Sequence, residues 1–320
     1  MQIRSNSPKE KLNEIASVSL QTEAIRVTSA ALIRFFALAT SLLSSAPAGS
    51  SPTSSGVSLS LVRGYALANV RINGNGPFRM MIDTGATSTS LTPRTAARAG
   101  LTYDHRVVLA TMAGEKTIPA SSNGHIVVGA ADESGMEIMV QEFPGRSKVN
   151  AEIDGILGQN FLDRSSYLIN YQLKQMWFGE EADVRSAELP IAVNAGESDR
   201  RMVLPVTLTP ETEPWHLVLD SGTNSLLLLC RDRCPPLSGL DPGTLLTSVG
   251  ERAVQRGVLK RITVGPATIF AGEAFVMESS APPGHQDGLL PTRWFSAIYV
   301  DSIHRIVRLA QSLAPRRKRE

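Results

Sequence analysis

The 320-residue sequence has little of what metal and cofactor sites require. It holds two cysteines and five histidines, and neither a His-Glu-x-x-His nor a Cys-x-x-Cys pattern occurs among them. Such patterns supply the paired ligands of zinc sites, so we expect no bound metal. The glycine-containing stretch 73–76 does not continue as a dinucleotide fingerprint, because Arg79 stands where the third glycine belongs. We therefore predict no cofactor.

An excess of charge of either sign is also missing. Lys and Arg total 32 against 30 Asp and Glu. The one dense basic run, 316–319, lies in a tail, residues 312–320, that we interpret as a solvated end. A nucleic-acid partner is therefore not expected. Apolar residues make up 42% and charged residues 19% of the chain, a balance typical of globular proteins rather than disordered ones.

The segment 1–48 differs from the rest of the chain in pattern. Arg26 and Arg34 precede an apolar run, residues 35–43, and a stretch of small residues that includes Ala-Pro-Ala at 46–48. This order is typical of a signal peptide, and the apolar run is much shorter than the about 20 residues that span a bilayer. We expect residues 1–48 to be a leader that directs export to the bacterial periplasm or the medium. A retained leader that anchors the protein to a membrane is the alternative.

The sequence contains an internal repeat. Residues 81–88, Met-Ile-Asp-Thr-Gly-Ala-Thr-Ser, recur as residues 218–225, Val-Leu-Asp-Ser-Gly-Thr-Asn-Ser, which gives Asp83 and Asp220 the same place in the two copies. Further matches follow in the same order and at nearly the same spacing: 114–115 with 250–251, 126–129 with 262–265, and 154–157 with 287–290. Collinear matches predict a tandem duplication. With the boundary near 180–190, we expect two lobes, residues 57–183 and 184–311, each of the size of a small domain.

Short apolar segments rich in Val, Ile and Leu, bounded by Gly, Asn and Pro, predict an all-β fold. Residues 65–72 and 78–82 flank a turn at 73–77 and form a hairpin that ends at Asp83. Strands over 202–208 and 215–219 lead into Asp220 in the same way. One helix is expected, residues 92–100, because Thr at 92 suits the N-cap, Pro at 93 the first turn and Gly at 100 the stop.

Both aspartates stand in an Asp-hydroxyl-Gly sequence after an apolar strand. Glycine lets another backbone come close, and the hydroxyl of Thr84 or Ser221 can hold its loop by a hydrogen bond. If the two loops meet, the carboxyls share one proton, so that one acts as base and the other as acid on a bound water. That chemistry hydrolyses an amide bond without a metal. The alternative is that each motif is an ordinary β-turn, in which Asp and Gly are common.

These motifs resemble those of a known family, the aspartic peptidases. Residues 81–86 resemble the active-site motif of the retropepsin-like members, and residues 219–225 resemble that of the pepsin-like members. Residues 154–162 are similar to the second signature of the family. The resemblance covers roughly residues 61–309. It implies two retropepsin-like β-barrel lobes related by a pseudo-twofold axis, with few short helices and a cleft that binds an extended peptide.

The resemblance also implies a set of site residues, which fall into three groups. They are the catalytic Asp83 and Asp220, supported by Thr84, Gly85, Ser221, Gly222 and Thr223; the flap glycines Gly114 and Gly250; and the second signature, Gly155, Ile156, Leu157 and Gly158 in the first lobe with Gly288, Leu289 and Leu290 in the second. We expect the Thr223 hydroxyl to donate to Asp220 and to make it the more readily ionised carboxyl.

The second lobe departs from the family pattern at Pro291, which follows Leu290 where the first lobe has Gly158. Cys230 and Cys234 lie soon after the second aspartate, where some pepsins carry a small disulfide loop. Because an exported chain meets an oxidising environment, we expect these two cysteines to be bonded, and two buried free thiols are the alternative.

Together these features predict an exported aspartic endopeptidase that hydrolyses peptide or protein substrates bound in extended form. We expect a monomer whose dyad is Asp83 and Asp220 of one chain. Two alternatives stay open. One is an inactive peptide-binding protein with the same fold, and the other is a homodimer in which Asp83 residues of two chains pair.

Overall fold

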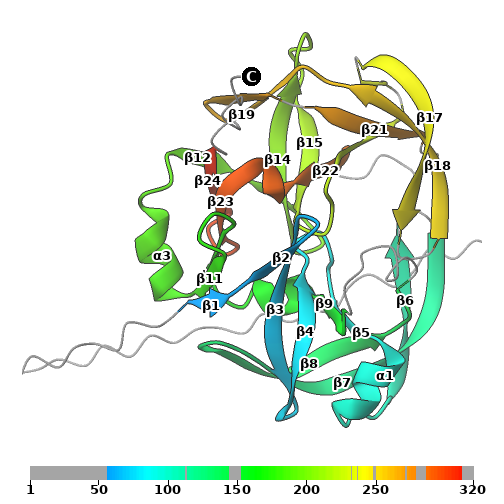
Figure 1. Ribbon diagram of the computed structural model, residues 1–320, viewed down its shortest axis with the longest axis vertical. Coiled ribbons are helices and arrows are strands. Elements are labelled where there is room, and N and C mark those ends of the chain that lie inside the picture. The colour runs from blue at the N-terminus through cyan, green and yellow to red at the C-terminus, as the bar shows by residue number, and fades with distance from the viewer. Residues whose placement is uncertain are drawn as a thin grey trace, which may run out of the picture. The chain divides into compact units, whose positions relative to one another are not determined.

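The computed structural model describes residues 56–111, 114–143, 153–231, 233–235, 237–247, 250–270, 272–278 and 286–311 (Figure 1). The expected leader, 1–48, and the expected basic tail, 312–320, lie outside these residues. All described residues belong to one compact unit, Pro52–Glu320. Within them the protein is all-β, as predicted, and carries three short α-helices.

One sheet of eight strands is built from the first half of the chain. Its strand order is β2-β3-β4-β9-β5-β8-β7-β6. The strands are β2 (Ser60–Val62), β3 (Tyr65–Ile72), β4 (Asn75–Ile82), β5 (Thr89–Leu91), β6 (His105–Thr111), β7 (Gly114–Val128), β8 (Ala131–Val140) and β9 (Gly155–Leu157).

A second sheet of ten strands is built from the second half. Its order is β17-β18-β21-β16-β22-β15-β14-β19-β20, with β13 paired to β14. The strands are β13 (Gly196–Ser198), β14 (Arg201–Leu208), β15 (Trp215–Asp220), β16 (Leu226–Cys230), β17 (Ser238–Thr247), β18 (Gly250–Val258), β19 (Arg261–Val264), β20 (Ala267–Phe270), β21 (Glu273–Glu278) and β22 (Gly288–Pro291).

The two sheets have the same pairing pattern around their aspartates. Strand β4, which precedes Asp83, pairs in parallel with β9, and β15, which ends at Asp220, pairs in parallel with β22. Strands β9 and β22 then pair antiparallel with β5 and β16. Strands β5 and β16 pair in parallel with β8 and β21. Parallel pairs require crossover connections, so a plain succession of hairpins does not give this order. Each aspartate therefore occupies the same place in its sheet.

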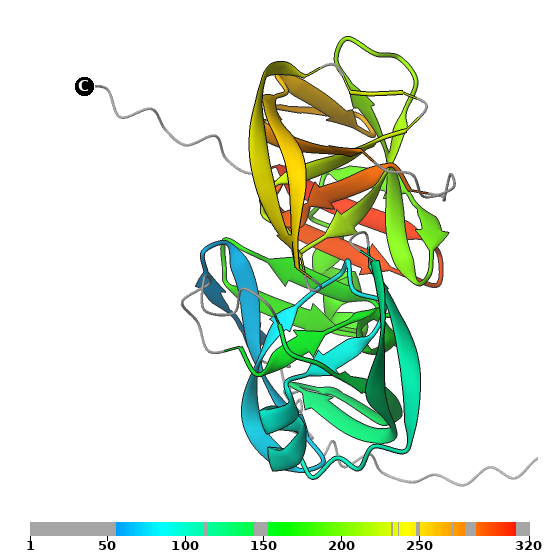
Figure 2. The same ribbon diagram turned by 90° about the vertical axis from the view of Figure 1, so that its right-hand side faces the viewer.

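A third sheet joins the two halves. Its order is β1-β11-β10-β23-β24-β12, with β1 (Val57–Ser58), β10 (Tyr167–Asn170), β11 (Gln175–Phe178), β12 (Ile191–Asn194), β23 (Phe295–Asp301) and β24 (Ile306–Gln311). Strand β10 of the first half pairs with β23 of the second, Tyr167 opposite Val300. In Figure 2 the blue and cyan strands of the first half and the yellow and orange strands of the second form separate groups. The shared sheet ties these groups through backbone hydrogen bonds, which also cover strand edges.

The hairpin of β3 and β4 positions Asp83. At its tip Asn73 and Gly74 have φ of 51° and 76°, as a two-residue hairpin turn requires. Strand β4 begins at Asn75, so this turn is shorter than the predicted 73–77. Phe78 and Ile82, with the methionine between them at position 80, are at most 1% exposed and fix β4 in the core. Asp83 thus follows a rigid strand.

Helix α1 (Pro93–Arg98) lies within the predicted 92–100, and the Thr92 hydroxyl accepts the N-cap hydrogen bond from the Thr95 N–H. Helices α2 (Gln159–Leu162) and α3 (Glu180–Ser186) were not predicted. Helix α3 occupies the region where the lobe boundary was placed. Its first turn is acidic, and Arg185 pairs with Glu181 one helical turn earlier. These are helix-stabilising features that the break in apolar pattern concealed.

Candidate active site

The loops after β4 and β15 interlock through their hydroxyl side chains. The Thr84 hydroxyl donates to the Leu219 carbonyl oxygen at 2.7 Å and accepts from the Ser221 N–H at 3.0 Å. The Ser221 hydroxyl donates to the Ile82 carbonyl oxygen at 2.8 Å and accepts from the Thr84 N–H at 3.0 Å. Thr84 and Ser221 are 1% and 3% exposed. Each hydroxyl therefore holds the loop of the opposite half, rather than its own loop as expected from sequence.

The glycine of each loop faces the carboxyl of the other. A Cβ atom on Gly85 would lie 2.4 Å from the carboxyl carbon of Asp220. A Cβ atom on Gly222 would lie 2.5 Å from the carboxyl carbon of Asp83. Both distances are far below an ordinary contact, so only glycine lets each carboxyl approach the opposite backbone. The two aspartates that the sequence singled out are thus brought together.

The two carboxyls have unequal surroundings. Asp83 Oδ1 accepts from the N–H groups of Gly85 at 3.0 Å and Ala86 at 3.1 Å, whereas Asp220 Oδ1 accepts from one, Gly222, at 2.6 Å. Burial raises the pKa of Asp83, although these N–H groups oppose the rise. Burial and repulsion by Asp83 raise the pKa of Asp220 well above its usual range. Two N–H donors stabilise the charged form of Asp83 and one stabilises that of Asp220, so the hydrogen-bond geometry favours Asp83 as the ionised member of the pair.

This order of ionisation corrects the expectation that Asp220 ionises more readily. That expectation relied on a hydrogen bond from the Thr223 hydroxyl to Asp220. The Thr223 hydroxyl instead donates to the Ser225 carbonyl oxygen at 3.1 Å. It stabilises the turn after the aspartate and does not stabilise the ionised Asp220 carboxylate.

The second signature lies directly behind the first loop. Gly155, Ile156 and Leu157 form β9, and the Leu157 carbonyl oxygen accepts from the Asp83 N–H at 3.0 Å. A Cβ atom on Gly158 would lie 2.5 Å from the Ser88 backbone. The segment after the signature also contributes, because Gln159 Nε2 donates to the Thr84 carbonyl oxygen at 3.0 Å.

Pro291 occupies the corresponding place in the second half. Gly288, Leu289 and Leu290 form β22 with Pro291, which lies opposite Asp220 in the parallel register. In the first half the Gly158 N–H donates to the Thr89 hydroxyl at 3.2 Å. In the second half Leu226 stands where the repeat places Thr89, so the side chain at this position offers no hydrogen-bond acceptor. Proline has no backbone N–H, so no donor at position 291 is left without a partner. The change to proline is matched by the change to leucine.

The acidic residues that begin the second signatures have a shared structural role. Asp154 Oδ2 accepts from the Arg79 N–H at 2.9 Å, and Asp287 Oδ2 accepts from the His216 N–H at 2.8 Å. Each carboxylate therefore anchors the signature segment to the strand that leads to the aspartate. Charge-assisted bonds of this kind fix the loop geometry.

The expected flap glycines begin strands β7 and β18. Gly114 pairs opposite Thr111 of β6, and Gly250 pairs opposite Thr247 of β17. Residues 112–113 and 248–249 lie outside the described residues, so the predicted flaps are described only from these glycines onward. Val108 and Leu109 of β6 line a cavity next to the aspartates.

A cavity of about 790 Å³ is lined by both carboxyls. Residues from both halves contribute to its wall. They are Asp83, Gly85, Ala86, Thr87, Ser88, Ser90, Val108, Leu109, Met139, Gln141 and Ile156 from the first half, and Asp199, Arg200, Arg201, Asp220, Leu229, Arg231, Gln286 and Leu289 from the second.

Two residues near the carboxyl pair, Arg201 and Tyr65, were not predicted from the sequence. Arg201 lines the cavity, its side chain is 15% exposed, and its charge lowers the pKa of both aspartates. Burial and the two nearby aspartates raise the pKa of Tyr65. Tyr65 and Arg201 begin the corresponding strands β3 and β14, but neither residue belongs to a motif that can be recognised in the sequence.

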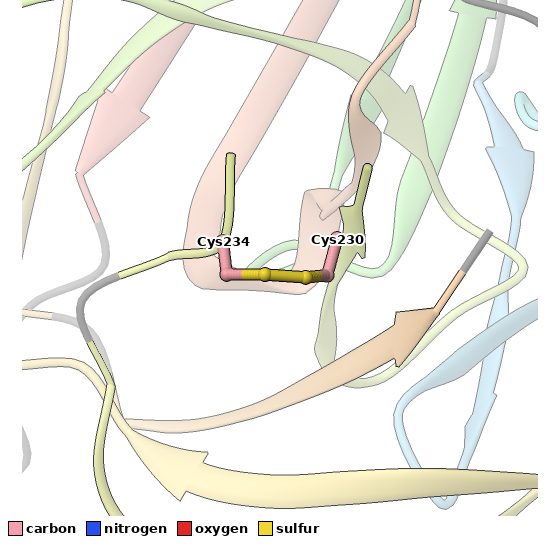
Figure 3. The surroundings of a disulfide bond; sticks show 2 residues. All are labelled: Cys230 and Cys234. Carbon is pink, nitrogen blue, oxygen red and sulfur yellow. A yellow bond between two sulfur atoms is a disulfide. The ribbon is translucent and has the colours of Figure 1, made fainter. Parts of the chain in front are cut away.

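Cys230 and Cys234 are joined in a disulfide (Figure 3). Cys230 ends strand β16, so the bond closes a short ring that includes the cavity residue Arg231. Elsewhere in the described ranges, no cluster of three or more His, Cys, Asp or Glu side chains is arranged to hold a metal ion. None of the helices in those ranges is long and apolar enough to cross a membrane.

Comparison with known proteins gives one family match. Residues 68–161 match the model of the aspartyl protease family. A search of curated proteins found no match. The matched segment runs from β3 to α2 and includes the loop of Asp83 and the second signature of the first half. This match supports an aspartic protease, a hydrolase of peptide bonds, in that part of the chain.

Proposed function

We propose that this protein is an exported aspartic endopeptidase whose catalytic dyad is Asp83 and Asp220 of one chain. The observation that carries the proposal is the reciprocal fit of the two loops. The glycine of each loop faces the carboxyl of the other, and each hydroxyl bonds the opposite strand. Two carboxyls at one cavity supply the acid and the base that amide hydrolysis needs.

In this proposal Asp83 is the base and Asp220 is the acid. A water molecule between them transfers a proton to Asp83 as its oxygen bonds to the substrate carbonyl carbon, and Asp220 donates its proton to the carbonyl oxygen. The tetrahedral intermediate then breaks its C–N bond. The leaving nitrogen takes the proton held by Asp83, and the hydroxyl protonated by Asp220 returns its proton. Both carboxyls regain their starting states, and no covalent bond to the protein forms.

The cavity supports a peptide substrate in extended form. Strand β6 is the last strand of its sheet, and its Val108 and Leu109 line the cavity. An edge strand offers backbone N–H and C=O groups to which an extended peptide can add. Met139 of the first half and Leu289 of the second add apolar wall for substrate side chains.

The contacts between the two loops of one chain favour a monomer over a homodimer in which the first halves of two chains pair. The first loop already bonds Leu219 and Ser221 of the same chain. Pairing of Asp83 with its copy in a second chain would require these buried hydrogen bonds to break. Buried groups left without partners destabilise a fold by about 1–3 kcal/mol each.

One observation favours the alternative of a peptide-binding protein without turnover. Pro291 stands opposite Asp220, so the backing of the second aspartate differs from that of the first. The accompanying Leu226 compensates for the missing N–H, as described above. We therefore place this alternative second to the endopeptidase.

The proposal of export rests on residues 26–48 and on the disulfide. A bond between Cys230 and Cys234 suits a periplasmic or extracellular protein, because disulfides persist in oxidising compartments.

Peptide-library digestion tests the proposed activity. The full-length protein and its Asp83→Asn variant are incubated with a mixed peptide library between pH 3 and pH 7, and products are identified by mass spectrometry. We expect internal cleavages by the wild type that are lost in the variant. Equal product patterns from the two proteins, or no cleavage by the wild type at any pH, would reject the endopeptidase and favour peptide binding alone.

A further inference from the structure

Three arginines line the cavity beside the carboxyl pair, and two of them are paired with acids. Arg200 Nη1 lies 2.8 Å from Asp163 Oδ2. Arg201 Nη2 lies 3.3 Å from Asp199 Oδ2. Among the described residues, no carboxylate lies within ion-pair distance of the third, Arg231. Arg231 is therefore the cavity cation whose charge has no matching acid in the described part of the chain.

The hydrogen-bonding capacity of Arg231 is also only partly used. Its Nη1 donates to the Gln286 carbonyl oxygen at 3.0 Å, while its Nε is buried and has no partner. The side-chain oxygen of Gln286 is likewise buried without a partner. Asp287, the next residue, is engaged by the His216 N–H. A buried guanidinium N–H without an acceptor is unfavourable, so this corner of the cavity is suited to an incoming acceptor.

The position of Arg231 is defined by its neighbours in the chain. It directly follows β16, whose end residue Cys230 is bonded to Cys234, so the guanidinium stands on a closed turn rather than on a long loop. Leu229 and Leu289 line the same cavity and give it apolar wall. An aliphatic stem that ends in a carboxylate matches this combination of apolar wall and guanidinium fork.

We propose that Arg231 recognises a carboxylate of the substrate, so that the cleft selects peptides with an acidic group at the position bound beside Leu229 and Leu289. The inference deepens the proposed peptidase function and rests on it. Glutamine and glutamate have the same shape, but only glutamate supplies a charged acceptor. The glutamine oxygen can accept one hydrogen bond, whereas a carboxylate accepts two from the guanidinium fork and adds the attraction of opposite charges, so glutamate is expected to bind more tightly.

Peptide binding to the Asp83→Asn form tests this recognition without turnover. The probes are octapeptides with one common apolar sequence and amidated ends, and a single glutamate occupies a different position in each. Every glutamate peptide is compared with the peptide that has glutamine at the same position. Calorimetry is expected to show one position where glutamate binds about 30-fold more tightly, equivalent to about 2 kcal/mol. A glutamine peptide with a free C-terminal carboxylate tells whether the recognised group is a side chain or a chain end.

Variants of Arg231 and of a matched control arginine show whether the preference for glutamate depends on Arg231. Arg231→Met in the same background is expected to bring each glutamate and glutamine pair to equal affinity. Arg94 is the control, because it stands at the corresponding position of the first copy of the repeat and is exposed on α1. Arg94→Met should leave the 30-fold preference intact. Arg231→Glu, which tests the charge should the methionine variant not fold, is expected to transfer the preference to lysine.

The outcomes separate this inference from the proposed function. Equal binding of glutamate and glutamine peptides at every position, with no preference for the free C-terminus, would overturn the role of Arg231. So would a preference that survives Arg231→Met. Cleavage by the wild type is measured in parallel with the same peptides. If peptides are cleaved without a preference for acidic residues, only the role of Arg231 is rejected. If acidic peptides bind more tightly but none is cleaved, only the proposed peptidase activity is rejected.

Discussion

Replacing Gly85 with alanine perturbs the carboxyl pair more directly than any substitution of a surface residue. The new Cβ atom would lie 2.4 Å from the Asp220 carboxyl carbon and 2.6 Å from each of its oxygens. Ordinary contacts begin at 3.4 Å, so the carboxyl must retreat by about 1 Å. The interlocked hydroxyls on either side hold both loops in place, and the retreat therefore falls on the Asp220 side chain.

Two effects of Gly85→Ala are expected from this displacement. Overpacking destabilises a well-packed core by about 1–3 kcal/mol. A misplacement of about 1 Å at a catalytic group lowers kcat/KM by about 100-fold, equivalent to about 2.7 kcal/mol of barrier. The assays are urea unfolding and the steady-state cleavage of a peptide found in the library digestion.

Gly272→Ala is the matched control, because a Cβ atom at Gly272 meets nothing within 4 Å. It should change both quantities little. If Gly85→Ala, like the control, keeps kcat/KM within threefold of the wild type, the expectation is refuted. Close packing of the Asp220 carboxyl against Gly85 would then not be required for activity.

Three further predictions follow from the site. Arg201→Met should shift both limbs of the pH profile of kcat/KM to higher pH, because the Arg201 charge lowers the pKa of both aspartates, and Arg201→Lys should shift them less; unchanged limbs would contradict this role. Thr84→Val should destabilise the fold by about 2–4 kcal/mol in urea unfolding, because the Ser221 N–H and the Leu219 carbonyl oxygen lose their buried partner. Thr84→Ser, which keeps the hydroxyl, should retain most of the stability, and an equal loss in both variants would show that the methyl group matters instead. Asp220→Asn should raise thermal stability more at pH 7 than at pH 4. The folded pKa of Asp220 lies above its unfolded value, so the wild type loses stability as pH rises through the folded pKa while the amide does not; a gain that is larger at pH 4 would contradict the direction of the shift.

The sequence was informative about the aspartates because local pattern and repetition coincide there. Asp83 and Asp220 follow apolar strands, precede glycines and recur at a fixed spacing, and each of these features is visible without a structure. The all-β fold followed from equally local features, the short β-branched segments and their turn residues. Helix α3 was missed because its helix-favouring charges lie in a segment that interrupts the apolar pattern.

The contacts between halves were beyond sequence reasoning. The hydroxyls of Thr84 and Ser221 had been expected to hold their own loops, but which partner a buried hydroxyl finds depends on how the two sheets approach each other. The same holds for Thr223, whose hydroxyl has a competing acceptor in the nearby Ser225 carbonyl oxygen. Arg201 and Arg231 carry no motif of their own, and only the cavity shows that they line the same space as the carboxyl pair.

In the proposed mechanism the second-half aspartate, Asp220, completes the site of the same chain. The most direct measurement is the rate of cleavage of one peptide by the wild type, Asp83→Asn and Asp220→Asn, each over a hundredfold range of protein concentration. We predict that both variants lose at least about a thousandfold in kcat and that the wild-type rate per chain is constant on dilution. Activity that survives Asp220→Asn, with a wild-type rate per chain that falls on dilution, would contradict the claim and assign catalysis to a dimer of first halves.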